Sequence, residues 1–338
     1  MVVQKLLSHN YSKNDTTDKP LKCTFAHFTS RSNIVKNAKY YLAAIAAFTT
    51  WGFFSLVLKP IHNYASLDIL FYRVFSCAAL MLLITVLFKR AKLREAMQKF
   101  KALPTDKRKK TVLLNVGGSM LLTVNWFSFI YVMNHVSVKA TSLAYLVCPI
   151  LTTMLAYFIL HEKLTKTQWA SVVLSIGGCV LLSYANIIDM IYSMVIGLSY
   201  AGYLITQRQN TSFDKFIVLT FHIVLSAIIL LPFYPSFSGA LPTEFKFYFY
   251  VEIIAVAFTI IPLFLNLFAL KGINSSTVGM LLNINPIIAF VLASLVYHEQ
   301  MTVMQFFAYG LIFVSIVVFN AHHIFGGREK QQPVAGTV

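Results

Sequence analysis

Long apolar stretches without strand-like alternation occupy the chain from about residue 40 to residue 325. A helix of about 20 residues crosses a hydrocarbon core, and continuous apolar runs favour helices over the alternating strands of a barrel. The pattern predicts spans at 40–58, 67–88, 111–133, 138–160, 168–186, 190–206, 216–233, 248–270, 275–297 and 304–325. The predicted fold class is therefore all-α integral membrane, with ten transmembrane helices.

One segment occurs twice, because residues 142–169 recur at 279–306 with a constant displacement of 137. The displacement aligns Pro149 with Pro286, His161-Glu162 with His298-Glu299, Thr165 with Thr302 and Gln168 with Gln305. Each copy has room for five apolar stretches, and a copy that follows an odd number of crossings must insert upside down. We therefore expect two inverted five-helix repeats, an arrangement found in many secondary transporters.

These patterns divide the chain into an N-terminal arm at 1–38, a first repeat at 39–187, a second repeat at 188–325 and a tail at 326–338. The first repeat contains a basic loop at 89–110. Its amphipathic pattern fits a segment lying on the membrane surface, and a solvated linker is an equal alternative.

Composition and charge agree with a lipid environment. Hydrophobic residues make up 57% of the chain, charged residues 12%, and the mean hydropathy is +0.69. With both termini in the cytoplasm, 24 of the 28 Lys and Arg residues fall on cytoplasmic segments, as expected for a protein of the cytoplasmic (inner) membrane. The net charge of +16 then indicates orientation and contact with anionic lipid at the basic loops rather than a nucleic-acid partner.

The sequence lacks the motifs of several other function classes. No phosphate-binding loop is present, and the four cysteines have neither zinc-site nor disulfide-framework spacing. We expect buried thiols, no cofactor, no metal and no enzyme activity. A membrane-embedded enzyme and a non-transporting membrane sensor or scaffold remain the alternatives to a transporter. The sequence leaves the oligomeric state open.

Arg73 heads the short list of ionisable residues inside predicted spans. Such residues persist in a bilayer mainly where they face a cavity or a partner. A guanidinium can bind a carboxylate or phosphate with two parallel hydrogen bonds, or it can bind the free carbonyls of a broken helix. Both interpretations place Arg73 against a central cavity that would receive a small-molecule substrate.

Pro149 and Pro286 lie near the middle of the fourth and ninth predicted helices. Each removes the hydrogen bond to the carbonyl four residues earlier, on Tyr145 and Leu282. Matching interruptions in two repeats indicate a binding site, although packed kinks without a ligand are an alternative. Ser142, Tyr145, Asn283 and Asn285 are the nearby polar residues.

Trp51, Asn125, Trp126 and Tyr203 add indole, amide and phenol groups, although Trp and Tyr also mark lipid interfaces. The candidate substrate-binding residues are Arg73, Trp51, Asn125, Trp126, Ser142, Tyr145, Pro149, Asn283, Asn285 and Pro286. For ion coupling the internal candidates are His222 and Glu252. A lone histidine in a helix usually serves packing, and Glu252 lies about one turn inside its helix, so the sequence assigns no proton relay.

Two modules resemble those of a known family. They run from Pro149-Ile150-Leu151 to His161-Glu162-Lys163-Leu164 and from Pro286-Ile287-Ile288 to His298-Glu299, each followed by Gln and an aromatic residue. They are similar to EamA-type transporters of the drug/metabolite transporter superfamily, whose members typically carry Gly in place of His161 and His298. Tyr72-Arg73-Val74 and Asn125-Trp126, with Ser142-Leu143-Ala144-Tyr145, resemble the RarD-like branch.

The resemblance implies a ten-helix basket with a central cavity that both repeats form. It implies movement of small metabolites, amino acids or drugs across the cytoplasmic membrane, often outward. We expect alternating access, in which a solute binds near mid-membrane between the proline-containing helices while the two halves rock.

Overall fold

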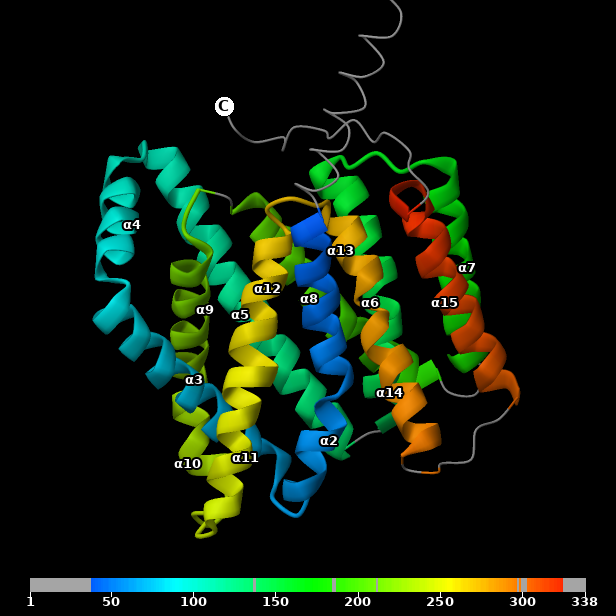
Figure 1. Cartoon of the computed structure of the whole chain (residues 1–338). Helices are drawn as coiled ribbons and strands as arrows, with labels where there is room; N and C mark the ends of the chain where they lie inside the picture. The colour runs from blue at the N-terminus through cyan, green and yellow to red at the C-terminus, as the bar shows by residue number, and fades with distance from the viewer. Residues whose placement is uncertain are drawn as a thin grey trace, which may run out of the picture. The chain divides into compact units, whose positions relative to one another are not determined.

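Helices joined by short loops make up the chain in the computed structural model, which describes residues 38–135, 138–183, 187–210, 212–296, 298 and 303–324. No strand occurs within these residues. Figure 1 shows the helices from Tyr40 onward standing side by side and reversing direction along the chain. The predicted N-terminal arm, apart from Ala38, and the predicted tail lie outside the described residues.

The first half begins with the helix Ala38–Gly52, which meets the helical segment Phe54–Ile61 at a bend of 42°. That segment comprises α2 (Phe54–Leu58) and a 3₁₀ turn (Lys59–Ile61). The chain continues with α3 (Ser66–Phe88), α4 (Arg90–Ala102), α5 (Thr105–His135), α6 (Val138–Leu160) and α7 (Lys166–Ser183). The predicted span 40–58 thus contains a bend, and most of the predicted loop 89–110 is helical.

The second half contains α8 (Ile187–Gln209), α9 (Lys215–Leu230), a 3₁₀ turn (Leu231–Phe233), α10 (Tyr234–Phe237) and α11 (Phe245–Ala255). A π-helical turn (Val256–Ile260) joins α11 to α12 (Ile261–Ala269). It ends with α13 (Ser275–Leu281), α14 (Ile284–Leu295) and α15 (Val303–Ile324). The predicted span 275–297 is interrupted, as the proline suggested, by a turn at 282–283 that separates α13 from α14.

Four described segments are long and apolar enough to cross a membrane: Ser66–Phe88, Thr105–Val132, Lys215–Phe237 and Phe245–Ala269. The bent pair Ala38–Gly52 and Phe54–Ile61 adds a fifth when it is taken as one span. Large apolar side chains on the outside of the helices are strongly exposed, among them Phe88 at 78% and Phe307 at 71%. Apolar surface of this extent requires lipid, so the chain is a multi-pass membrane protein.

α4 differs from the other long helices because none of its residues is buried. Its sequence is rich in strong helix formers, which explains why this segment is not an irregular loop. Glu95 pairs with Lys99 at 2.8 Å and with Lys92 at 2.9 Å. Hydrogen bonds from these two ammonium groups lower the pKa of Glu95 to about 2, so the triad stays ionised at neutral pH.

The interior is centred on α8, which packs against α5, α6 and α13. Its buried residues Tyr200, Tyr203 and Leu204 form one core cluster with Phe48 of the first helix and Leu282. α7 packs against α15, and α3 packs against α9. Cys77, Cys148 and Cys179 are buried thiols, as expected, and Cys23 lies outside the described residues.

His161 and His298 share an unusual backbone conformation, with φ angles of 54° and 52°. Among the described residues they are the non-glycine positions with positive φ, and they lie 137 residues apart. After His161 the chain turns so that the Glu162 amide donates to the Ala156 carbonyl and closes the end of α6. The left-handed region suits glycine and strains other residues, so both histidines occupy positions that favour glycine.

This strain predicts that His161→Gly and His298→Gly each stabilise the protein. Relief of a left-handed non-glycine residue is worth about 1 kcal/mol, partly offset by the greater backbone freedom of glycine when unfolded. We expect the thermal unfolding midpoint to rise by about 1–3 °C per substitution, measured by intrinsic fluorescence of the detergent-purified protein. Lys163→Gly is the control, since its φ is negative, and it should lower the midpoint. Equal midpoints for the histidine variants and the wild type would contradict the strain argument.

Candidate functional site

Arg73 on α3 lies over an aromatic ring, with its guanidinium carbon 5.3 Å from the centre of the Trp126 ring on α5. The side chain is half-buried, and its Nε atom is buried without a hydrogen-bond partner. Within the described part of the chain, the ion pairs involve Glu95 and not Arg73. A ring face attracts the guanidinium but accepts no conventional hydrogen bonds from its N–H groups. The Trp126 ring therefore positions the Arg73 guanidinium, while the buried Nε–H group of Arg73 remains available to a ligand.

Tyr145 on α6 lies close enough to Arg73 for the charge of the guanidinium to act on its phenol. The Tyr145 ring is half-buried and packs on Phe129, with 5.5 Å between ring centres. Three helices thus bring together three of the predicted binding residues, namely Arg73, Trp126 and Tyr145. The combination offers a cation, a flat indole and a hydroxyl around one region of the interior.

Asn125 precedes Trp126 but serves a different contact. Its side-chain nitrogen donates to the Ile196 carbonyl at 2.9 Å and to the Ser199 hydroxyl at 3.3 Å, both on α8. The residue is buried between α5 and α8. Because the amide donor is used by the neighbouring helix, Asn125 fastens α5 to α8.

Trp51 at the end of the first helix contacts the irregular turn between α11 and α12. Its indole N–H donates to the Phe258 carbonyl at 2.7 Å. Pro262 lies four residues after Phe258 and has no N–H, so a regular helix could not satisfy that carbonyl. The indole takes the place of the missing donor. The Trp51 ring also meets Tyr200 edge-on, with 6.1 Å between ring centres.

The two proline regions differ in structure. Pro149 is buried within α6, which remains continuous, whereas Pro286 lies in the first turn of α14 just after the break. The expectation that Leu282 has a free carbonyl is wrong, because that carbonyl accepts the Asn285 N–H at 3.1 Å.

α13 packs closely on α6 at Gly279. A Cβ on Gly279 would lie 2.7 Å from Cβ of Thr152, so the two helices can approach this closely only because residue 279 is a glycine.

Asn283 occupies the break itself and is fully buried, yet neither its amide oxygen nor its amide nitrogen has a hydrogen-bond partner. Asn285 is buried to 91%. A buried amide without partners is costly, and sites of this kind meet a ligand or an ordered water in many proteins. The side chain of Ser142 lies outside the part that the structure describes.

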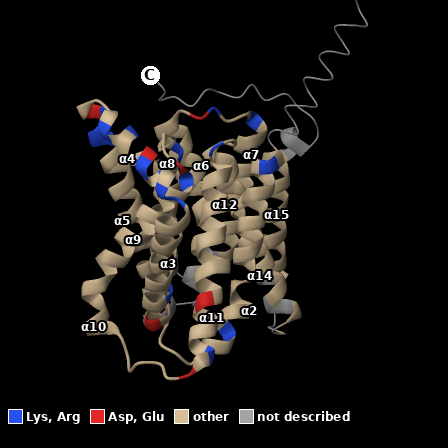
Figure 2. Ribbon diagram, turned by 60° about the vertical axis from the view of Figure 1, so that its left-hand side comes forward, with Lys and Arg blue, Asp and Glu red and all other residues tan. Residues whose placement is uncertain are grey.

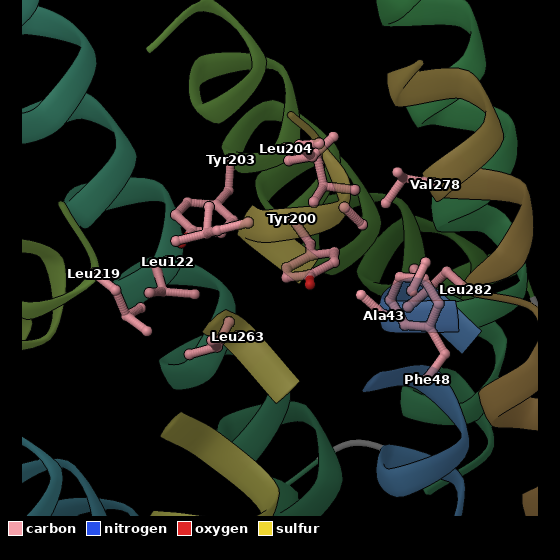
Figure 3. Close-up of a cluster of buried hydrophobic side chains, with 14 of the residues drawn as sticks. Ala43, Phe48, Leu122, Tyr200, Tyr203, Leu204, Leu219, Leu263, Val278 and Leu282 are labelled. Carbon is pink, nitrogen blue, oxygen red and sulfur yellow. The ribbon is translucent and has the colours of Figure 1, made fainter. Parts of the chain in front are cut away.

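α8 carries a buried polar stripe, of which the sequence singled out only Tyr203. Tyr200, Tyr203 and Gln207 are spaced by three and four residues and therefore share one face of the helix. Figure 3 shows Tyr200 and Tyr203 projecting from α8 into the cluster of buried side chains. The Tyr200 hydroxyl accepts from Asn266 at 2.9 Å, whereas the Tyr203 hydroxyl has no partner. Helical spacing of these residues was the sequence signal that could have identified the stripe.

The two coupling candidates have different surroundings. His222 on α9 is fully buried, and its ring meets Tyr203 edge-on with 5.7 Å between ring centres. Glu252 on α11 is exposed, and its carboxylate accepts a hydrogen bond from Ser76 on α3. Only the histidine therefore lies in the interior.

Glu162, just after α6, joins the two halves through three hydrogen bonds. Its carboxylate accepts from the Ser275 amide at 2.9 Å, the Ser276 amide at 3.1 Å and the Ser276 hydroxyl at 2.6 Å. Glu162 is 8% exposed, so these charge-assisted bonds are sheltered from water. They bind the end of α6 to the start of α13.

Comparison with known proteins agrees with this architecture. The model of the EamA-like transporter family matches the chain twice, at residues 38–184 and 188–321. Uncharacterized transporter YojE of Bacillus subtilis is 26% identical over 280 residues, covering 81% of this chain and 91% of YojE. Protein RarD of Escherichia coli is 23% identical over 295 residues, covering 86% of this chain and 97% of RarD. A crystal structure with 12% identity superposes with a TM-score of 0.66, covering 85% of this chain and 98% of that chain. The predicted resemblance is confirmed.

The Trp51 contact predicts that Trp51→Phe lowers stability. Phenylalanine keeps the ring but leaves the Phe258 carbonyl without a donor, which costs about 1–3 kcal/mol for a buried acceptor. We expect faster amide hydrogen exchange across 256–262 and a lower thermal midpoint. Trp169→Phe, at an exposed indole, is the matched control and should change neither quantity. Unchanged exchange in Trp51→Phe would mean that the indole does not support this turn.

Proposed function

Since this chain belongs to the EamA-like transporter family, we propose that it is a secondary transporter that exports small metabolites, amino acids or drugs across the cytoplasmic membrane by alternating access. The observation that carries the proposal is the interior cation, Arg73, which lies over Trp126 beside Tyr145 without a carboxylate partner in the described chain. Such a site matches an organic anion or a zwitterion with a flat apolar body.

The proposed architecture is ten spans in two inverted five-helix repeats, 39–187 and 188–325. Two successive matches to one family model support the duplication. The nearly equal φ angles of His161 and His298 support it independently, because the displacement of 137 residues joins the same two positions. In Figure 1, α6 and α14 end at opposite ends of the bundle, as inversion requires.

The proposed orientation places both termini in the cytoplasm. Figure 2 shows Lys and Arg gathered mainly at the end of the bundle where α4 leads into α5 and where α6 leads into α7. Short loops rich in these residues stay in the cytoplasm. In this orientation the exposed cationic helix α4 faces the anionic lipid of the inner leaflet.

In the proposed cycle the Glu162 contact keeps the cytoplasmic end closed. Arg208 on α8 reinforces that end, since it donates to the Leu270 carbonyl and, at 3.4 Å, to the Asn274 side chain. Leu270 and Asn274 belong to the segment that connects α12 to α13, so Arg208 holds this segment against α8. Opening toward the cytoplasm requires Glu162 to leave Ser275 and Ser276, and a solute bound at Arg73 then becomes accessible from that side.

The role of Arg73 can be tested by ligand-dependent thermal stability. We expect at least one of L-phenylalanine, L-leucine, benzoate, thymidine and chloramphenicol to raise the midpoint of the wild type, because a ligand that binds only the folded state stabilises it. Arg73→Ala should abolish the shift, and Arg73→Lys should weaken it by about tenfold in affinity because two-point binding is lost.

Arg94→Ala, at an exposed position on α4, is the control and should keep the full shift. A ligand that stabilises Arg73→Ala as strongly as the wild type would place the site elsewhere. Loss of folding in both Arg73 variants would make the arginine structural.

Glu162→Gln should loosen the cytoplasmic end. The amide is neutral and accepts with one oxygen, so the charge-assisted bonds to α13 are lost, at about 1.5–3 kcal/mol each in a sheltered site. We expect amide exchange at 275–282 to accelerate about tenfold or more, while exchange in α7 and α15 is unchanged. Asp106→Asn, at an exposed position in the first turn of α5, serves as the control. Equal exchange rates would show that Glu162 does not close this end.

A further inference from the structure

Three fully buried polar side chains from two helices meet near the cytoplasmic end of the interior. Tyr203 and Gln207 come from α8, and His222 comes from α9. Four of their polar atoms have no hydrogen-bond partner: the Tyr203 hydroxyl, Oε1 of Gln207, and both ring nitrogens of His222. Buried polar groups in native proteins are almost always paired, so unpaired atoms concentrated in one place need a physical explanation.

Gly118 on α5 shows how closely these groups approach one another. A Cβ at this position would lie 2.7 Å from Nε2 of Gln207, 3.3 Å from Oγ1 of Thr206 and 3.4 Å from Nε2 of His222. The polar ends of α8 and α9 side chains therefore lie together over the backbone of α5. Only glycine leaves room for them.

The unpaired atoms are complementary to one particular species, a protonated imidazole. A neutral imidazole has one N–H donor and one acceptor, whereas an imidazolium has two donors. Oε1 of Gln207 and the Tyr203 hydroxyl are two neighbouring acceptors that no other donor uses. Neither ring nitrogen bonds these acceptors in the described arrangement. Protonation gives the ring a second donor, so that a side-chain shift within the cluster pairs each ring nitrogen with one acceptor.

The charges around His222 determine when this can happen. Lys215, seven residues earlier on α9, is buried, lies within electrostatic range of the imidazole, and donates to the carbonyls of Gln207 and Asn210. Its ammonium repels an imidazolium. Lys89, at the C-terminal end of α3, places its ammonium 6.0 Å from the centre of the Phe216 ring, six residues before His222 on α9. The remaining printed contacts of α9 are with uncharged groups: Thr85 from α3, Thr123 and Gly118 from α5, and Phe264 from α12.

We propose that His222, Tyr203 and Gln207 form a proton-binding site that couples a proton gradient to the transport cycle. The inference rests on the proposed transport function. His222 lies about 10 Å along α9 from Lys215, at 1.5 Å per residue, and thus below the end that Glu162 closes. In the closed arrangement the imidazole is neutral beside Lys215. When the end opens, water reaches the site, screens the ammonium and delivers a proton to the imidazole.

The first experiment measures coupling in vesicles of phosphatidylethanolamine and phosphatidylglycerol, with a radiolabelled solute from the panel that binds the wild type. Two fluxes are compared: accumulation driven by a pH gradient, and exchange of labelled for unlabelled solute without a gradient. For the wild type the gradient should raise accumulation about tenfold or more. His222→Asn and Tyr203→Phe should lose this gain but keep exchange within about twofold, since exchange needs no net proton transfer.

Ser226→Ala is the matched control, because Ser226 is buried one turn further along α9 and is already paired with Thr123. It should keep both fluxes. Wild-type exchange without any effect of the gradient would overturn the coupling site and leave the transport function standing. Parallel loss of both fluxes in His222→Asn and Tyr203→Phe would also overturn it, since that pattern marks a packing role. Absence of any exchange in the wild type counts against the proposed function.

The second experiment needs no solute. Nuclear magnetic resonance spectra of the imidazole nitrogens are recorded for the wild type and for His222→Asn in the same vesicles at several pH values. The difference between the two spectra gives the signal of His222. We expect the His222 signal to change from neutral to protonated as the pH falls from about 8 to about 5. Gln207→Leu should weaken protonation because one acceptor is lost. A signal that stays neutral throughout this range would overturn the proton site whether or not transport is observed.

Discussion

Every buried polar group in an apolar helix bundle needs a partner, because lipid supplies none and burial without one is costly. Most polar contacts in this structure follow from that constraint. Ser175 on α7 pairs with Ser315 on α15 at 2.7 Å, Thr123 on α5 pairs with Ser226 on α9 at 2.8 Å, and Glu162 pairs with the start of α13. These bonds join helices that are far apart in sequence, so they specify which helices are neighbours where apolar contact alone would not discriminate.

The same constraint separates two groups of residues that look alike in the sequence. Asn125 and Trp51 are polar residues in apolar helices, and both prove to be partnered by backbone carbonyls of other helices. Asn283 and the Nε atom of Arg73 are equally interior but have no partner. Identity and spacing cannot distinguish these cases, because the partner belongs to a distant part of the chain. For this reason the sequence could name the candidate residues but could not divide them into packing and binding groups.

Helix positions were predictable where the apolar pattern alone determines them. The apolar pattern places α3 and α6 within about one residue of their bounds. The constant offset of 137 residues between the two copies aligns His161 with His298, and these two residues share one backbone conformation. The interruptions were less predictable. Pro286 identifies where a hydrogen bond is lost, yet the chain redistributes its bonds, so that the break falls three residues earlier and the Leu282 carbonyl is satisfied by Asn285. At Pro262 the replacement donor is Trp51, 207 residues away along the chain, which no local pattern reveals.

The scaffold and the interior therefore follow different physical rules. The end of α6 depends on backbone geometry and on one carboxylate that binds main-chain amides, and these contacts do not depend on what the protein transports. The interior depends on side chains such as Arg73 and His222: the Nε atom of Arg73 and both ring nitrogens of His222 have no partner in the described chain. Substitution of an unpartnered residue breaks no internal bond, so the interior can change with little loss of stability. Family membership therefore indicates transport, while the solute has to be inferred from the interior residues of this chain.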